Sequence, residues 1–177
     1  STIYLFYNAY YKSSKSMIIT VPLILSFIVT FVLVWLFVKT IGNKKWLSVL
    51  IALVVTPFAY FYLLYPMVNI FSSYHHEKYF NASDWEEYPA QRFEMMSDIL
   101  NDSTFIGKTK AEVKSKLGKA EWYGWDDAIK ANSEDKWNYN LGFKPGAFTK
   151  DQECLEFVFK NDTLQSIRNY QLEQKFE

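Results

Sequence analysis

Two long apolar stretches dominate the first 71 residues, which contain no Asp and no Glu. The stretches run from Met17 to Val38 and from Trp46 to Phe71, and neither contains a charged side chain or a histidine. As helices they would be about 33–39 Å long, which is enough to cross a hydrocarbon core about 30 Å thick. The sequence therefore predicts a transmembrane hairpin, with helices at 17–39 and 46–71 and a short loop at 40–45.

The first stretch is too long for the hydrophobic region of a signal peptide, about 7–15 residues, and a second stretch follows at once. We therefore expect a retained membrane anchor. Pro22, Pro57 and Pro66 predict kinks or, in the case of Pro66, an early end of the second helix. Because ion pathways need polar groups within the membrane, the uncharged stretches favour an anchor or a packing surface.

Charge divides the chain into two unlike parts. Five lysines give the first 71 residues a charge of +5, and the remaining residues carry −5 with both signs mixed. A nucleic-acid partner would require a basic patch, which this mixture does not provide. Lys39, Lys44 and Lys45 flank the loop, so the positive-inside rule predicts a cytoplasmic loop, with the N-terminus and the C-terminal domain on the other side.

Residues 1–16 combine aromatic rings with two lysines. This composition is typical of an interfacial N-terminal segment, with rings toward the lipid and ammonium groups toward water. A disordered tail is the alternative, although the aromatic density argues against it. We expect Tyr4, Phe6 and Tyr7 to contact a partner protein or the lipid.

After a linker at 72–82, residues 83–177 have the pattern of a small soluble domain. Residues 82–103 are expected to form one helix that begins near Ser83 or Pro89. Its apolar stripe consists of Phe93, Met96, Ile99 and Leu100. A second, short helix follows, in which Thr109 and Glu112 form a capping box and Gly118 is the expected terminator.

Three strands are predicted after these helices. The first two, within 136–142 and 153–159, each place three large apolar side chains on one face: Trp137, Tyr139, Leu141, Leu155, Phe157 and Phe159. A tight turn at 160–163 leads to a third strand at 164–170, whose imperfect alternation indicates a bulge. The helix-helix-strand-strand-strand order predicts an α+β membrane protein whose soluble domain is an antiparallel meander with helices on one face.

Residues 105–121, FIGKTKAEVKSKLGKAE, carry a recognisable motif. They resemble the signature "G-x-T-x-x-E-V-x-x-h-L-G-x-P" of the SmpA/OmlA group, the BamE-like fold, where h is a hydrophobic residue. The group also includes the tandem repeats of β-lactamase inhibitor protein. Tyr139–Gly142 and residues 155–167 match its later strand and hairpin, and residues 80–100 resemble a helix in small bacterial proteins of this fold. Ala120 stands where the family usually has proline, and the two apolar stretches have no counterpart in the lipoprotein members.

The resemblance implies a non-enzymatic interaction module on the extracytoplasmic side. Members are assembly subunits of membrane machines or inhibitors, but a shared fold does not carry over a partner. The motif residues have structural roles as turn, cap and core. They are Gly107, Thr109, Glu112, Val113, Leu117 and Gly118.

Side chains with catalytic or ligand chemistry are sparse in this sequence. His75 and His76 are adjacent and would point in different directions, so we expect an exposed pair and no metal site. Asp126 and Asp127 lack the alternating spacing of a calcium loop. Cys154 has no neighbouring histidine and is expected to be a small packed side chain. Without a catalytic motif, the sequence predicts no enzyme, cofactor or small-molecule substrate.

An aromatic segment lies in the connection that precedes the first predicted strand. It contains Trp122, Tyr123 and Trp125. Tryptophan and tyrosine in a loop are typical of partner-contacting residues. Capping of the sheet core and contact with the membrane surface are the alternatives.

These features together predict a non-enzymatic accessory or assembly subunit of a larger bacterial inner-membrane complex. Its partners would be integral membrane proteins and the lipid bilayer. The alternative is a membrane-tethered inhibitor or immunity-type binding protein that uses the same domain. A membrane enzyme whose site the sequence does not reveal is a third reading.

Overall fold

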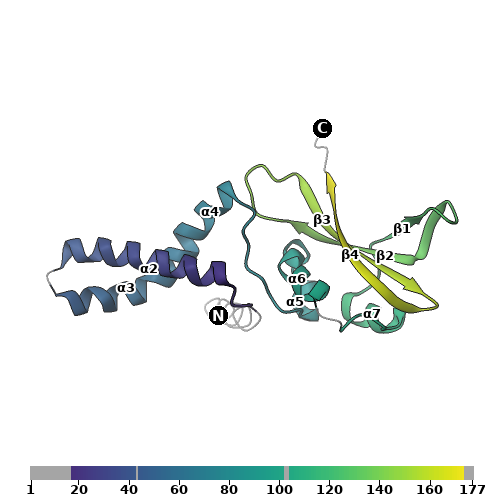
Figure 1. Cartoon of the computed structure of the whole chain (residues 1–177), viewed down its shortest axis with the longest axis horizontal. Coiled ribbons are helices and arrows are strands. Elements are labelled where there is room, and N and C mark those ends of the chain that lie inside the picture. The colour runs from purple at the N-terminus through teal and green to yellow at the C-terminus, as the bar shows by residue number, and fades with distance from the viewer. Residues whose placement is uncertain (1–16, 43, 102–103, 174–177) are drawn as a thin grey trace, which may run out of the picture. The chain divides into compact units, whose positions relative to one another are not determined.

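The computed structural model describes residues 17–42, 44–101 and 104–173. The predictions for residues 1–16, including Tyr4, Phe6 and Tyr7, lie outside this description. The described chain is α+β, with two apolar helical segments and a four-stranded antiparallel sheet (Figure 1). It divides into a helical unit, Ile19–His75 with Pro145–Ala147, and an α+β unit that comprises the rest.

The helical unit is a hairpin. Its elements are α2 (Val21–Ile41), α3 (Lys45–Ala59), the π-helix η1 (Tyr60–Leu64) and α4 (Tyr65–Phe71). Thr20 caps α2 by accepting a hydrogen bond from the Leu23 backbone N–H at 3.4 Å, so the helix begins later than the Met17 of the sequence prediction. The segments Val21–Ile41 and Lys45–Phe71 are both long and apolar enough to cross a membrane.

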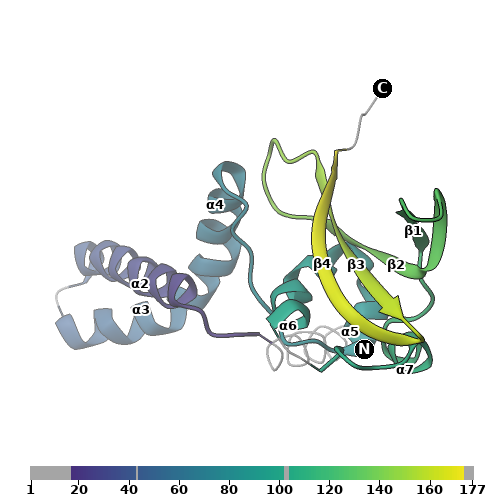
Figure 2. The ribbon, with the colours of Figure 1, turned by 45° about the vertical axis from the view of Figure 1, so that its right-hand side comes forward.

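The second segment bends but does not end at Pro66. Proline lacks the N–H that would bond to the carbonyl of Tyr62, and its ring crowds that carbonyl. The preceding turn widens into a π-helix, in which the Tyr65 N–H donates to the Tyr60 carbonyl. Figures 1 and 2 show α4 turned away from the axis of α3. The predicted early end is therefore wrong, and so is the kink at Pro22, which lies in the first turn of α2 where proline is tolerated.

The α+β unit places its helices on one face of the sheet (Figures 1 and 2). The helices are α5 (Ala82–Glu87), the 3₁₀-helix η2 (Pro89–Met95), α6 (Met96–Asn101) and α7 (Lys110–Leu117). The strands are β1 (Trp122–Asp126), β2 (Ala131–Phe143), β3 (Asp151–Lys160) and β4 (Thr163–Glu173). They form an antiparallel meander in the order β1-β2-β3-β4.

The predicted order of one helix, a second helix and three strands is wrong in two places. The expected single helix over 82–103 is divided into α5, η2 and α6, because Tyr88 precedes a proline and leaves the helical region at φ −124° and ψ 65°. The aromatic segment at 122–126 forms the additional strand β1. Gly124 and a register shift between Tyr123 and Trp125 interrupt the alternation by which a strand is predicted.

The core confirms the predicted apolar faces. Phe93, Met96 and Ile99 of the helical stripe are buried, and all six strand residues predicted to share a face lie in the same cluster. The capping box of Thr109 and Glu112 is present, with the Glu112 carboxylate accepting from the Thr109 N–H at 2.9 Å. These hydrogen bonds hold the pKa of Glu112 below its usual value.

The turn between β3 and β4 is as tight as predicted. Asn161 and Asp162 have φ values of 50° and 63°, as a two-residue hairpin turn requires. The predicted bulge is present, because the β3–β4 register shifts between Val158 and Phe159.

The α+β unit also includes the residues that flank the hairpin in the chain. The Ile18 N–H donates to the Glu77 carbonyl at 2.7 Å, and Met17 forms an antiparallel bridge with Lys78. The Lys78 ammonium lies 2.6 Å from the Glu94 carboxylate, and both side chains are largely buried. The segments before α2 and after α4 are therefore held together within this unit.

Candidate partner-binding surfaces

The hairpin packs through small side chains. Ser48, Ala52 and Thr56 follow one another at four-residue spacing along α3, and all three are buried. In α2 the buried residues are Leu23 and Thr30. Small residues at this spacing allow two helix backbones to approach closely within a membrane. The interface thus requires no large apolar side chain from the middle of α3.

The hydroxyl groups of the hairpin bond to carbonyls of their own helices. Ser26 and Thr30 donate to carbonyls four residues earlier at 2.7 Å each, and Ser48 and Thr56 do so at 3.3 and 2.7 Å. A polar group in an apolar medium costs several kcal/mol when it has no partner. These hydroxyls have acceptors within their own helices, as a lipid environment requires.

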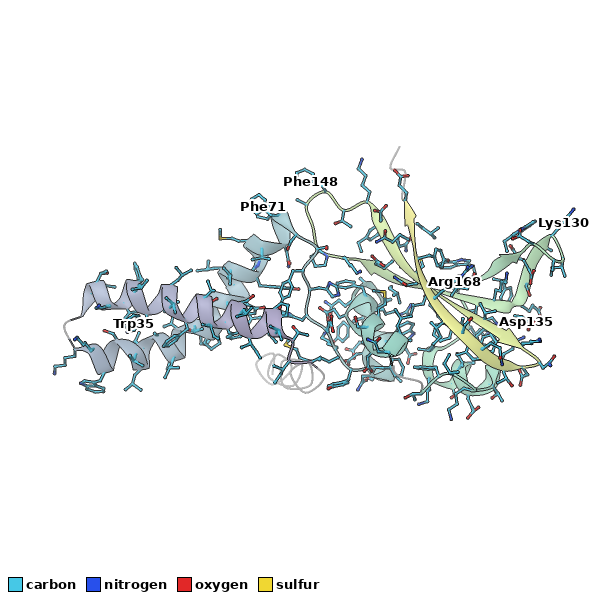
Figure 3. The ribbon with its side chains drawn as sticks, in the orientation of Figure 1. Trp35, Phe71, Lys130, Asp135, Phe148 and Arg168 are labelled. Carbon is cyan, nitrogen blue, oxygen red and sulfur yellow. The ribbon has the colours of Figure 1, made fainter. Side chains whose placement is uncertain are left out.

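The outer surface of the hairpin consists of exposed apolar side chains (Figure 3). In α2, only 11% of the most apolar 18-residue stretch is buried. In Lys45–Phe71, the corresponding share is 22%. A core helix of a soluble domain would instead bury most of its apolar face. Apolar surface of this extent is typical of segments that contact a membrane or other proteins.

The second exposed apolar surface is the β1 edge, which we define as Trp122, Tyr123, Trp125 and Ile129. The first three are the predicted contact residues, and all three lie on β1, while Ile129 lies in the turn to β2. Trp122 is half-buried, whereas Tyr123 and Trp125 are 44% and 56% exposed. Within the described residues β1 pairs with β2 alone, so its other edge carries unpaired backbone groups.

The backbone of β1 closely approaches side chains of β2 and β3 at Gly124. A Cβ atom added to Gly124 would lie 2.5 Å from Oε2 of Glu156 on β3 and 3.0 Å from Nδ2 of Asn138 on β2. The Lys136 ammonium donates to the Trp125 carbonyl at 2.9 Å. A side chain at this point of β1 would therefore require Glu156 and Asn138 to shift.

A polar network joins β2, β3 and β4. Glu156 and Asn138 are buried, the Tyr170 hydroxyl donates to Oδ1 of Asn138 at 2.8 Å, and Arg168 on β4 lies 2.7 Å from Glu156. Burial raises the pKa of the neighbouring Cys154 thiol to about 11 and that of Tyr170 to about 12. Both groups are therefore neutral at pH 7, and the thiol is a packed side chain as the sequence predicts.

Arg92 fixes the start of β1, although sequence reasoning did not single it out. Its Nε donates to the Trp85 carbonyl at 2.7 Å, and its Nη1 donates to Oε1 of Glu121 at 2.5 Å and to the Asn140 carbonyl at 3.1 Å. The guanidinium also lies 4.7 Å from the Trp85 ring centroid. The sequence did contain one signal for this role, because Arg92 lies next to the predicted apolar stripe. An arginine buried there needs hydrogen-bond partners.

The polar residues considered as ligands do not converge on a common site. His76 is buried, so the expected exposed histidine pair is wrong for this residue. Asp126 accepts from the Ala128 N–H at 2.9 Å, and Asp127 accepts from the Trp125 indole at 2.9 Å. Across residues 17–42, 44–101 and 104–173, no group of three or more His, Cys, Asp or Glu side chains is arranged to hold a metal ion.

An open cleft of about 580 Å³ lies between α5 and α7, and the sequence did not predict it. Lys114, Lys116 and Lys119 contribute to its wall, with Glu86 as a counter-charge. The Trp85 indole donates to the Leu117 carbonyl at 3.0 Å and holds the two helices together at its base. One side of the cleft therefore carries an excess of basic side chains.

No protein-family model, curated protein or solved structure matches this chain. The resemblance of residues 80–170 to the BamE-like fold therefore stays a prediction.

Proposed function

We propose that this chain is a non-enzymatic accessory subunit of a larger bacterial inner-membrane complex, anchored by the α2–α4 hairpin. The observation that carries the proposal is the apolar outer surface of the hairpin, of which so little is buried within the chain. At 1.5 Å per residue, the 21 residues of α2 extend about 31 Å and the 27 residues of Lys45–Phe71 extend about 40 Å. Both lengths suit a hydrocarbon core of about 30 Å.

The packing of the hairpin favours a membrane anchor over a soluble core or a signal sequence. A core helix of a soluble protein buries its apolar side chains, whereas these helices expose them. A signal sequence is one short segment, whereas α2 and α3 form a closely packed pair through Ser48, Ala52 and Thr56. Lys39, Lys44 and Lys45 favour a cytoplasmic loop, with the α+β unit on the extracytoplasmic side.

The β1 edge supports a role in protein binding. Its unpaired backbone suits an added strand from a partner, and Tyr123 and Trp125 provide large aromatic surfaces beside it. Gly124 and Arg92 hold this edge in place, so a partner would meet a preformed surface. Preorganisation of this kind reduces the entropic cost of binding.

Purification of the tagged full-length chain from its native membrane in mild detergent tests the proposal. We expect a defined set of integral membrane proteins in constant ratio. The Tyr123→Ala/Trp125→Ala variant should lose at least part of that set, whereas Phe148→Ala, which removes an exposed aromatic side chain elsewhere, should retain it.

Recovery of the wild-type chain alone, or as a homo-oligomer, would overturn the subunit proposal. The membrane-tethered inhibitor would then be the function to test. Retention of all partners by the Tyr123→Ala/Trp125→Ala variant would show that the β1 edge is not the binding surface.

A further inference from the structure

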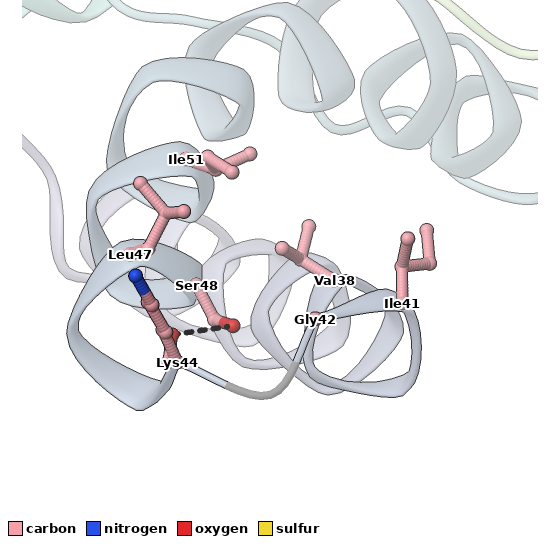
Figure 4. A pocket seen from close by; sticks show the side chains of 7 residues that line it. All are labelled: Val38, Ile41, Gly42, Lys44, Leu47, Ser48 and Ile51. Carbon is pink, nitrogen blue, oxygen red and sulfur yellow. Dashed lines mark hydrogen bonds between the residues drawn. The ribbon is translucent and has the colours of Figure 1, made fainter.

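A groove of about 250 Å³ opens between α2 and α3 beside their connecting loop (Figure 4). Its walls are mainly aliphatic, with one charged residue. The side chains that matter are Val38, Ile41, Leu47, Ile51, Lys44 and Ser48. The Ser48 hydroxyl donates to the Lys44 carbonyl at 3.3 Å, so it has an acceptor and the groove presents an apolar interior. The groove is smaller than the roughly 300–1,000 Å³ of pockets that enclose a drug-sized ligand.

Lysine side chains flank the connecting loop beside this groove. Lys44 lines it, and Lys39 and Lys45 are exposed on either side of the loop. The sequence has no acidic residue before Glu77 to neutralise them. An amphiphile with an anionic head and an apolar tail matches this combination of charge and apolar lining.

The start of α3 adds to the positive potential. Lys44 occupies the N-cap position, and an ammonium group has no lone pair to accept hydrogen bonds from the first N–H groups of the helix. Lysines at a helix N-terminus also lie at the positive end of the helix dipole. This arrangement is unfavourable in isolation and becomes favourable when an anion lies beside it.

We propose that this groove binds one anionic phospholipid. The lipid phosphate lies against the ammonium groups of Lys44 and Lys45, and part of one acyl chain lies between Val38 and Ile41 of α2 and Leu47 and Ile51 of α3. The inference rests on the proposed function, because it requires the hairpin to lie in a bilayer with its loop at headgroup depth. Basic pockets between membrane helices bind anionic headgroups by the same physics.

Native mass spectrometry of the full-length chain in neutral detergent tests the proposal. Phosphatidylglycerol and phosphatidylcholine with identical acyl chains are titrated separately. We expect one phosphatidylglycerol to bind at least about tenfold more tightly than phosphatidylcholine. Inorganic phosphate at the same concentration should not compete, because it lacks the acyl chain. Equal affinity for the two lipids, or full competition by phosphate, would overturn the proposal.

Two variants locate the site. Lys44→Gln/Lys45→Gln should reduce phosphatidylglycerol affinity about tenfold, whereas Lys150→Gln/Lys160→Gln, which removes two exposed lysines from the α+β unit, should not change it. Leu47→Trp fills the groove at a partly exposed position and should weaken binding without a change in charge. Unchanged affinity in the first variant or in Leu47→Trp would overturn the site.

Alkaline carbonate extraction of native membranes separates the two proposals. Release of the wild-type chain into the soluble fraction would overturn the membrane anchor and the lipid site with it. A chain that resists extraction and binds both lipids equally would overturn the lipid site alone.

Discussion

Gly124 shows how one residue sets the position of β1. The Glu156 carboxylate that it approaches is buried and paired with Arg168, so it has little freedom to move aside. We expect Gly124→Ala to destabilise the chain by about 1–3 kcal/mol, the usual cost of overpacking. For a domain of this size, that corresponds to a decrease in Tm of several degrees in a thermal unfolding experiment.

The matched control for this substitution is Asn132→Gln, which adds one methylene at an exposed position of β2. Its Tm should remain close to that of the wild type. An unchanged Tm in Gly124→Ala would contradict the close approach of β1 to Glu156.

Cys154 offers a test of burial, because it is the only cysteine in the sequence. Its side chain is buried and its pKa is raised to about 11, so a thiol-reactive dye at pH 7.5 should react only after unfolding. The measurement compares the labelling rates of native and denatured protein. Rapid labelling of the native chain would show that the sheet does not enclose the thiol.

The same pKa shift predicts a loss of stability at alkaline pH. An unfolded thiol ionises at about pH 8.5, whereas the folded one remains protonated to about pH 11. The folded state therefore binds the proton more tightly, and the contribution of the thiol to stability is complete below about pH 8.5 and disappears as the pH rises through 11. The decline in Tm over this interval should be smaller in Cys154→Ala than in the wild type.

At the scale of elements, the α2–α3 interface depends on small side chains. Ala52 is fully buried in the hairpin, so Ala52→Leu should force the helices apart and lower the Tm of the detergent-solubilised chain. Val54→Leu adds a methylene on the exposed surface of the same helix and serves as the control. Equal Tm values for the two variants would show that the helices do not pack through the Ser48–Ala52–Thr56 face.

Elements with strong local signals were predictable from the sequence, and those that depend on distant contacts were not. The capping box of Thr109 and Glu112 marked the start of α7, and regular alternation marked β2 and β3. By contrast, β1 combines a glycine with a bulge, and it depends on Glu156 and Lys136, which are distant in sequence. A search for alternating apolar and polar residues therefore does not predict such a strand.

The same distinction holds for the candidate surfaces. The aromatic character of the β1 edge was visible in the sequence, but its support by Arg92 joins residues far apart in the chain. Likewise, the lysines beside the loop were apparent, whereas the groove between α2 and α3 exists only after the two helices have packed.

At the scale of the whole molecule, the proposed orientation in the membrane is directly measurable. Because native Cys154 is buried, it should not react, and labelling of an introduced cysteine can be measured without interference from it. In spheroplasts, Ser166→Cys on β4 should react with a membrane-impermeant maleimide, and Thr40→Cys beside the loop should react only after permeabilisation. The reverse pattern would place the loop outside and the α+β unit in the cytoplasm.

The hydrogen bond between Ile18 and Glu77 brings the two ends of the hairpin together, so the hairpin can be deleted from the chain. Because these residues already hydrogen-bond at 2.7 Å, residues 19–75 can be exchanged for a short Asn-Gly turn without separating the flanking segments. The shortened protein should be water-soluble and should retain the buried ion pair of Lys78 and Glu94. A hairpin inserted in this way can be gained or lost as one segment, so the proposed membrane anchor and the proposed partner-binding surface can change independently.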